Sequence, residues 1–565
     1  MVPQKLRICK HGPQMNQDVE TPRASIITAL VPILVLIALL GINVVLFGED
    51  SSYGPNQIAL LLAAATAAIA GFCLKIPFSQ MLDGIKKAIG SALTAMLILL
   101  LIGSLAGTWM MSGIVPAMIY YGLDILNPKI FLFASAVVCA IVSVASGSSW
   151  STVATVGIAL LGIGAALGVN EALAAGAIIS GAYFGDKISP LSDTTNLAAA
   201  MAGTDLIRHI KYMLWTTIPS FTIALVIYLA IGFNAESTAL VTDTAALKAE
   251  VLSHFDTLSP ALLLVPFVVF IMVILKFDAL AALFVGSVLG GLLAIAFQPM
   301  MITQIAGLDN EEVVNADTKE VTSAPPSYLK RSYVAFINSM AYETSGVSGD
   351  DADAAKADLK SAKLESARRQ TDNPNLTQEE FEESELKLEE TFPELEAKIA
   401  AAKLLKGKGM SGMLNTIWLI ITAMCFGGIM ESCGFLRRIT EPLVAVSQSN
   451  GALVTTTAGS CMFVNATASD QYLAIVVPGQ MFRETFEERG LAPENLSRTL
   501  EDSGTVTSVL VPWNTCGAAQ SGVLGVEVLL YAPYCFFNWI SPLMTIAIGF
   551  LGIGVAKLND LKSGK

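Results

Sequence analysis

Two aspartates and a lysine stand within the stretch FGDKISPLSDTTN, between runs of small and apolar residues on both sides. They are Asp186, Lys187 and Asp193. A carboxylate inside a membrane costs roughly 2.5–3.5 kcal/mol on insertion scales, so such a residue is interpreted as functional. Burial favours its neutral form and a bound cation favours its ionised form, so one carboxylate can hold either H⁺ or Na⁺. The stretch therefore indicates an ion-exchange site, with Asp193 as the leading exchange group and Asp186 as a second one. A surface loop, or an Asp186–Lys187 pair at a helix end, is the structural alternative.

The stretch VPWNTCG (residues 511–517) interrupts an apolar run in the second half of the chain in the same way. A helix that is interrupted in a membrane leaves backbone carbonyls and amides that can bind ions. Na⁺ is a hard cation and prefers oxygen ligands, as Mg²⁺ and Ca²⁺ do. We therefore expect Na⁺ as the metal ion and no resident cofactor. The side chains expected to bind Na⁺ or H⁺ are Asp186, Asp193, Thr194, Thr195, Asn196, Asn514 and Thr515.

Two further polar segments, SGSSWST (146–152) and NATASDQ (465–471), each stand between two apolar arms. Such arms are either two short spans or a re-entrant hairpin, whose non-helical tip must be buried in protein or line a wet cavity. We predict hairpins whose tips meet the two interruptions. The expected tip or substrate-binding residues are Ser146, Ser148, Ser149, Asn465, Thr467 and Asp470. Further candidates, for which an ion pair, a helix cap or a solvated vestibule is the alternative, are Asp502, Lys187 and Glu431.

The composition is that of a polytopic membrane protein. Only 14% of the 565 residues are charged and 53% are hydrophobic, with a mean hydropathy of +0.62, whereas a soluble domain has about 25% charged residues. Apolar runs of about 20 residues, enough for a membrane-spanning helix, recur along the chain. No Walker loop or dinucleotide motif suggests ATP hydrolysis or another enzyme activity. Three separated histidines, and eight cysteines without a C-x-x-C pair, predict no histidine metal cluster and no disulfide framework.

Landmarks in the two halves recur at similar spacing. Ser148 precedes Asp193 by 45 positions, and Thr467 precedes Asn514 by 47. Duplication explains this match, and the predicted topology makes the copies antiparallel, as in many secondary transporters. The predicted fold is all-α, with two inverted-topology repeats, each containing a re-entrant hairpin and a broken helix. The predicted segments are a cytoplasmic tail (1–24), a first repeat (25–233), a second repeat (260–299 and 413–556), an acidic helical insertion (300–412) and a cytoplasmic C-terminal tail (557–565).

Lys and Arg in short loops and tails predict the orientation. If both hairpins are re-entrant, eighteen of these residues, Arg498 among them, fall on one face and two on the other. Both termini are therefore predicted to be cytoplasmic, and the first span to be retained instead of cleaved as a signal. The insertion, with 21 acidic and 13 basic residues, is then predicted to be periplasmic, because long loops translocate largely regardless of charge.

Three stretches carry a resemblance to a known family. GTWMMSGIVPAMIYYGL, SGAYFGDKISPLSDTTNLAAAMAGTD and VPWNTCGA resemble the NhaC family of bacterial Na⁺/H⁺ antiporters, over residues 90–230 and 413–556. The resemblance implies Na⁺/H⁺ exchange by an inner-membrane protein with inverted repeats. Because the family also contains Na⁺- or H⁺-coupled exchangers of amino acids and organic acids, such a substrate stays the alternative. The implied partners are Na⁺, H⁺ and the lipid bilayer, without nucleic acid, and a homodimer stays open.

Overall fold

The structure is a computed structural model that describes residues 24–558 with several gaps. The gaps are residues 48–49, 52, 126, 235–243, 276, 309–310, 315–320, 346–352, 360, 362–394, 396, 400, 403–404 and 447–448. Most of the predicted cytoplasmic tails and much of the predicted insertion therefore lie outside the described residues.

The elements follow one another in two similar series. The first series is α1 (Ile26–Phe47), α2 (Pro55–Cys73), α3 (Phe78–Met111), α4 (Ile114–Ile125), α5 (Pro128–Ser146), α6 (Ser149–Thr152), the π-helix η2 (Val153–Gly157), α7 (Ile158–Ala166), α8 (Glu171–Ile188), α9 (Asp193–Ala202) and α10 (Leu206–Asn234). After α11 (Thr244–Ser253), the second series is η3 (Pro260–Leu263), α12 (Leu264–Ile274), α13 (Ala279–Phe297), α18 (Leu414–Ser432), α19 (Phe435–Val446), α20 (Asn450–Thr467), α21 (Gln471–Glu488), α22 (Pro493–Leu500), the π-helix η5 (Glu501–Thr505), η6 (Ser508–Leu510), α23 (Thr515–Leu524), α24 (Val528–Tyr531), η7 (Ala532–Tyr534) and α25 (Phe536–Leu551).

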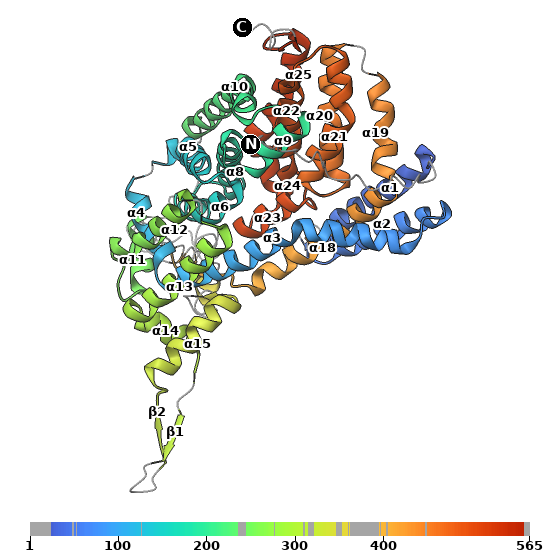
Figure 1. Ribbon diagram of the computed structural model, residues 1–565. Helices are drawn as coiled ribbons and strands as arrows, with labels where there is room; N and C mark the ends of the chain where they lie inside the picture. The colour runs from blue at the N-terminus through green and yellow to red at the C-terminus, as the bar shows by residue number, and fades with distance from the viewer. Residues whose placement is uncertain are drawn as a thin grey trace, which may run out of the picture.

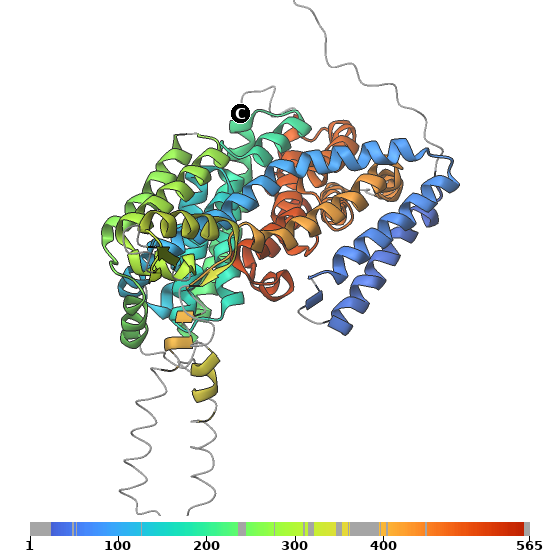
Figure 2. The same cartoon turned by 90° about the horizontal axis from the view of Figure 1, so that it is seen from below.

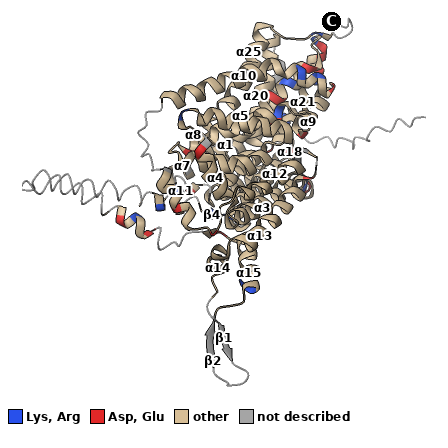
Figure 3. Cartoon of the chain, turned by 90° about the vertical axis from the view of Figure 1, so that its left-hand side faces the viewer, with Lys and Arg blue, Asp and Glu red and all other residues tan. Residues whose placement is uncertain are grey.

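The predicted all-α polytopic membrane protein is confirmed. Within the described part of the chain, eight helices are long and apolar enough to cross a membrane. A ninth span results if α24, η7 and α25, which are bent by 57° at their junction, are counted as one. Lys, Arg, Asp and Glu lie mostly toward the ends of the molecule, and the helices between them carry few (Figure 3). This distribution fits a protein whose middle lies in lipid.

The longest helix, α3, runs beside α18 through the middle of the molecule (Figure 1). α1 and α2 lie at one end of this pair and α12 and α13 at the other (Figure 2). α3 and α18 occupy the same place in the two series. α2, which precedes α3, packs on α18, and α13, which precedes α18 in its series, packs on α3. The order of elements thus agrees with the predicted duplication, while the antiparallel orientation of the repeats stays a prediction.

Both helix interruptions have the same local cause. Pro190 follows α8 and Pro512 follows η6, and a proline disfavours helical backbone in the residue before it. A side-chain cap then starts the next helix: Ser192 accepts a backbone N–H of α9 at 3.4 Å, and Asn514 accepts one of α23 at 3.0 Å. Such caps satisfy N–H groups that have no partner within the helix. The two predicted broken helices are therefore present as α8–α9 and as α22–α23.

Small residues hold α8 against α5. A Cβ atom added to Gly181 would lie 2.1 Å from the carbonyl oxygen of Ala136, and one added to Gly185 would lie 2.4 Å from that of Ala140. Close approach of two backbones through glycine is typical of helix contacts in membranes. Since Gly185 directly precedes Asp186, this contact fixes the position of the end of α8.

The described part of the insertion packs on membrane helices. It contains α14 (Pro299–Ala306), α15 (Tyr328–Ala341), η4 (Ser411–Met413) and two antiparallel strand pairs, β1 (Glu311–Val314) with β2 (Val321–Ala324) and β3 (Thr344–Ser345) with β4 (Lys406–Gly407). The β1–β2 ribbon projects from the molecule (Figure 1), and the sequence analysis did not predict these strands. α15 packs on α3. Just after β4, Lys408 donates to the carbonyl of Gly522 at 2.6 Å, in the last turn of α23.

Candidate functional site

Asp186 joins the end of α8 to the turn between α5 and α6, the predicted first hairpin tip. Both arms of this hairpin are among the eight candidate spans, so its re-entrant course stays a prediction. Its Oδ2 accepts hydrogen bonds from the backbone N–H and the hydroxyl of Ser149, at 3.0 and 2.7 Å. Ser149 is the first residue of α6, directly after the turn at Gly147, where φ is +69°. Asp186 is 5% exposed, and its Oδ1 has no hydrogen-bond partner among the described residues. One oxygen of this buried carboxyl is therefore held, and the other is available to an ion.

Lys187, the next residue, forms a buried ion pair with Asp502 of η5. Both side chains are fully buried. Lys187 also donates to Ser541 at 3.0 Å and lies 5.6 Å from the centre of the Phe537 ring. A buried ion pair persists only when further hydrogen bonds satisfy it, and Ser541 provides one of them. The pair joins the first broken helix to the second.

Glu501 also joins the two broken helices. It is fully buried, and its Oε1 accepts a hydrogen bond from Thr194 of α9 at 3.1 Å. Its Oε2 has no hydrogen-bond partner among the described residues, and the carboxylate interacts electrostatically with Asp186 and Lys187. Asp502 was among the predicted candidates and Glu501 was not. The available signal was two acidic residues in succession, directly before the apolar and hydroxyl-bearing stretch SGTVTSVLV (503–511).

Four side chains, Asp186, Lys187, Glu501 and Asp502, thus form what we call the buried charge cluster. Three carboxylates and one ammonium leave a formal charge of −3 + 1 = −2 if all are ionised. Uncompensated charge in the interior is costly, so cations or protons must balance it. No three His, Cys, Asp or Glu side chains in the described residues lie close enough to hold one metal ion. A cation bound here would therefore be coordinated by no more than two of these carboxylates, together with hydroxyl and backbone oxygens.

The other predicted residues of the first interruption lie around this cluster. Asp193 is exposed, and its Oδ2 accepts a hydrogen bond from Tyr472 of α21 at 2.5 Å. Thr195 donates to the carbonyl of Lys187 at 2.9 Å, which closes the gap between α8 and α9. Asn196 is exposed and donates to the carbonyl of Ser192 at 2.6 Å. The structure therefore brings Asp186 and Thr194 to the cluster, and places Asp193 and Asn196 at its solvent-exposed edge.

The second hairpin tip meets the second interruption. Asn514 donates to the carbonyl of Asn465 at 3.0 Å, and the backbone N–H of Thr515 donates to the carbonyl of Ser469 at 3.0 Å. Asn465 in turn donates to the carbonyl of Gly504 at 2.7 Å, within η5. The predicted residues Asn465, Asn514 and Thr515 are therefore buried together. They lie next to η5, the element that carries Glu501 and Asp502.

The remaining residues predicted at the second tip serve its own helices. Asp470 caps α21 by accepting the backbone N–H of Leu473 at 2.9 Å. Thr467 donates to the carbonyl of Phe463 at 2.8 Å, one turn earlier in α20. Both side chains therefore have a structural role in the helices of this hairpin.

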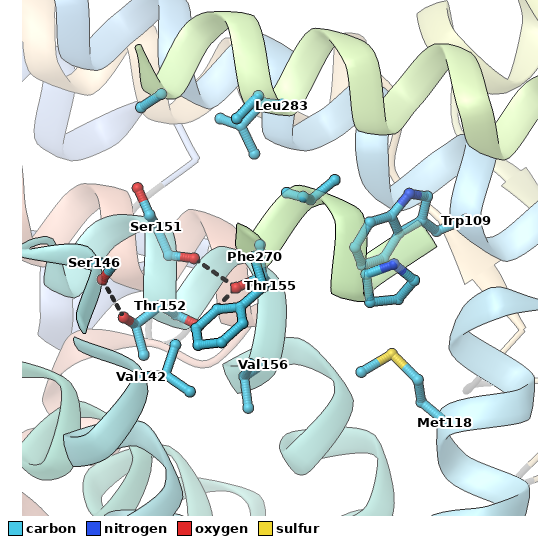
Figure 4. Close-up of a pocket in the computed structure, with 14 residues that line it drawn as sticks. Trp109, Met118, Val142, Ser146, Ser151, Thr152, Thr155, Val156, Phe270 and Leu283 are labelled. Atoms are coloured by element: carbon cyan, nitrogen blue, oxygen red, sulfur yellow. Dashed lines mark hydrogen bonds between the residues drawn. The ribbon is translucent and has the colours of Figure 1, made fainter. Parts of the chain in front are cut away.

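The first tip has a second face, away from Asp186. Ser146 lies 3.3 Å from Thr152, hydroxyl to hydroxyl, and Ser148 caps α6 by accepting the backbone N–H of Ser151 at 3.2 Å. Figure 4 shows Ser146, Ser151 and Thr152 on one side of a small cavity and Trp109 on the other. The cavity measures about 40 Å³ and is mostly apolar. Of the three predicted serines of this tip, Ser149 alone contacts the cluster, and Ser146 faces the cavity.

One acidic and one basic residue lie in surroundings other than those predicted for them. Glu431 pairs with Lys87 at 2.9 Å and is partly exposed, outside the cluster. Arg498 was predicted in a short cytoplasmic loop, but it lies within α22 and is fully buried. Its guanidinium lies 4.7 Å from the centre of the Tyr212 ring. The second broken helix thus begins earlier in the chain, with α22, than the polar sequence of this segment suggested.

The chain is similar in sequence to known proteins along most of its length. Residues 181–323 and 389–553 match the family model of the Na⁺/H⁺ antiporter family. The chain is 34% identical to the Na⁺/H⁺ antiporter NhaC of Alkalihalophilus pseudofirmus, over 89% of this chain and 92% of that protein. It is 29% identical to the malate-2H⁺/Na⁺-lactate antiporter of Bacillus subtilis, over 90% of this chain and 93% of that protein. It is 31% identical to the arginine/ornithine antiporter ArcD of Halobacterium salinarum, over 94% and 93%.

Both interruptions and all four members of the buried charge cluster fall within the residues matched by the family model. The coverage of the NhaC relative is nearly complete on both sides. The chain belongs to the Na⁺/H⁺ antiporter family, as its resemblance to NhaC predicted.

Proposed function

We propose that this Na⁺/H⁺ antiporter of the bacterial inner membrane exchanges its two ions at the buried charge cluster. The observation that carries the proposal is the charge imbalance of the cluster at the meeting point of two broken helices. Its three carboxylates exceed its one ammonium, so a bound Na⁺ or a bound proton lowers the cost of burial. Competition between the two for the same carboxylates is sufficient for exchange.

Asp186 is the proposed exchange group. Ser149 holds one of its oxygens and the other has no partner among the described residues, so the carboxyl can bind an ion without losing its anchor. Glu501, with one unpartnered oxygen, is the proposed second carboxylate. Asp502 is engaged by Lys187 and supplies a fixed counter-charge. The hydroxyls of Ser149 and Thr194 are the additional oxygen ligands nearest to these carboxylates.

Alternating access requires the two halves to move against each other around this site. The bonds that join the halves across the site include Lys187 to Asp502, Thr194 to Glu501 and Tyr472 to Asp193. We propose that the pair Lys187–Asp502 persists in both states and that the two weaker contacts change. The proposed orientation has both termini in the cytoplasm and the insertion in the periplasm.

The test is a pH-gradient assay in everted membrane vesicles. Addition of Na⁺ alone should dissipate the gradient with the wild type. Asp186→Asn keeps the shape of the side chain but removes its charge and its titration, so we expect loss of exchange with normal membrane insertion. Asp278→Asn is the matched control, because Asp278 is an exposed helix cap of α13 and asparagine caps equally well. Wild-type activity in Asp186→Asn would refute the assignment.

A second candidate function is the Na⁺- or H⁺-coupled exchange of an amino acid or a small organic acid. It is favoured by the hydroxyl groups at the first hairpin tip and by the similarity to relatives whose names specify malate, lactate, arginine and ornithine. The same vesicles separate the two functions. Dissipation that appears only after such a solute is added would support the second candidate and remove the first.

A further inference from the structure

A second set of buried polar groups runs between α10, α22 and α25. α10 packs on both other helices, and η5, which continues α22, packs on α25. Eight of the nine side chains are fully buried and Glu494 is 3% exposed. The nine, which we call the polar column, are His209, Thr216 and Thr217 on α10, Glu494, Ser497, Arg498 and Asp502 on α22 and η5, and Ser541 and Thr545 on α25.

Members of the column recur at helical spacing. Seven residues, about two turns or 10 Å, separate His209 from Thr216 along α10. Four residues, about one turn, separate Arg498 from Asp502, and the two members on α25 are also one turn apart. Each of the three helices thus presents a line of polar groups on one face.

The inner end of the column is part of the buried charge cluster. Oδ1 of Asp502 accepts hydrogen bonds from Thr216 at 3.2 Å and from Ser541 at 3.1 Å, in addition to its pair with Lys187. Thr216 and Ser541 therefore connect the column directly to the ion site.

The outer end of the column reaches the surface. Nδ1 of His209 lies 2.7 Å from Oγ of Ser497, and Ser497 donates to the carbonyl of Glu494. Glu494 pairs with Arg208 at 3.2 Å, and the Arg208 side chain is 52% exposed. This surface is the one predicted to face the cytoplasm. The column thus extends from a solvent-exposed ion pair to the cluster.

Six of the nine members carry polar atoms that have no hydrogen-bond partner among the described residues. These atoms are Nε2 of His209, Oγ1 of Thr217, Oε2 of Glu494, Nε and Nη2 of Arg498, Oδ2 of Asp502 and Oγ1 of Thr545. Buried polar groups are as a rule satisfied by protein or by ordered water, and a buried water makes two to four such bonds. Donors and acceptors along one interface are what a line of water molecules requires.

We propose that the polar column conducts protons between the Arg208–Glu494 surface and the exchanging carboxylates of the buried charge cluster, along a route that Na⁺ does not use. The inference rests on the proposed function. An imidazole can take up a proton at one nitrogen and release one from the other, and hydroxyls both donate and accept. A proton moves by transfer between neighbouring groups, whereas Na⁺ needs a shell of oxygen ligands along its whole path.

The test compares two kinds of exchange in proteoliposomes that contain the full chain. Na⁺/H⁺ exchange is followed by the change in internal pH, and Na⁺/Na⁺ exchange by radioactive Na⁺ at equal concentrations on both sides, which needs no net proton movement. The double variant Thr217→Val, Thr545→Val removes two hydroxyls and keeps similar shapes. Thr457→Val is the matched control, because Thr457 is equally buried and bonds to its own helix at 2.8 Å.

We expect the double variant to slow Na⁺/H⁺ exchange on the order of 10²-fold, the low end of what a positioned proton-transfer group contributes. Na⁺/Na⁺ exchange and the control should stay at wild-type rates. Equal loss of both activities would mean a structural role and would overturn the proposal, as would no change in either. Failure of the proposed function is recognised separately, by full Na⁺/H⁺ exchange in Asp186→Asn or by its absence in the wild type.

Discussion

Asp502 and Asp186 differ in how their oxygens are used. Three donors, Lys187, Thr216 and Ser541, converge on one oxygen of Asp502. Asp186 receives both of its hydrogen bonds from Ser149. Each carboxylate keeps one oxygen without a hydrogen-bond partner among the described residues. The difference is the partner of the other oxygen: Asp502 pairs with an ammonium, whereas Asp186 accepts only from the neutral Ser149. In the proposed mechanism Asp502 is therefore the structural charge and Asp186 the exchanging one.

The Lys187–Asp502 pair leads to a stability prediction. Asp502→Asn removes the direct ion-pair partner of the buried Lys187 ammonium, and breaking a buried pair in this way should cost about 3–5 kcal/mol. A thermal unfolding series in detergent should show a clear loss of melting temperature. The double variant Lys187→Met, Asp502→Leu replaces both charges by apolar groups and should recover most of that stability. A double variant as unstable as the single one would argue that the pair does more than balance charge.

Competition at one site predicts a pH dependence of Na⁺ affinity. In the proposed mechanism H⁺ and Na⁺ bind the same carboxylates, so the apparent KM for Na⁺ should fall as the pH rises, until the carboxylates are fully ionised. The measurement is Na⁺-driven gradient dissipation at a series of pH values. A KM that stays constant from acid to alkaline pH would indicate separate sites for the two ions.

The sequence predicted the first-half residues of the cluster better than the second-half ones. Asp186, Lys187 and Thr194 stand in a polar interruption between apolar runs, and that contrast is visible without a structure. Glu501 follows the polar helix α22, in a segment that resembles a solvated loop, so its burial depends on packing against α9 and α20. Asp193 had the strongest motif in the sequence, yet it lies at the exposed edge of the cluster, where its partner is Tyr472, 279 residues away in the chain. A contact between residues so far apart is not visible in the local sequence.

At the scale of elements, the contact between α5 and α8 positions the ion site. Gly181→Ala would place a Cβ atom 2.1 Å from a backbone oxygen of α5, so the two helices must separate. We expect reduced stability and strongly reduced exchange, because the end of α8 carries Asp186. Gly41→Ala is the control, since no atom lies within 4 Å of its added Cβ. Purified yield, melting temperature and gradient dissipation are the measurements. Normal exchange in Gly181→Ala would show that this contact does not position the site.

The broken helices were predictable because local chemistry causes them. A proline and a capping Ser or Asn end one helix and begin the next, whatever the surroundings. The π-helical turns η2 and η5 were not predictable. They depend on how the tips pack against distant helices, and π-helical turns are frequent at functional sites. The strands β1 and β2 were missed because the helical prediction came from the part of the insertion that is rich in Ala, Glu, Lys and Leu. EEVV and VTSA instead contain the β-branched residues typical of strands.

At the scale of the whole molecule, the inverted repeat predicts where the insertion lies. A cysteine in place of Ser361, which is exposed, should react in intact spheroplasts with a maleimide that does not cross membranes. A cysteine in place of Glu488, exposed at the end of α21, should react only after lysis. Both variants need a background without Cys73, which is itself exposed. The opposite labelling pattern would overturn the predicted orientation.

The bond between Lys408 and Gly522 gives the insertion a mechanical connection to the ion site. α23 is a rod of ten residues, about 15 Å long; Lys408 is bound to its last turn, and Asn514, its first cap, is bound to the second hairpin tip. A displacement applied at one end of so short a rod reaches the other. An antibody fragment that binds the insertion should therefore slow exchange without entering the ion pathway. The insertion would then be a site at which the transporter can be inhibited from outside the ion pathway.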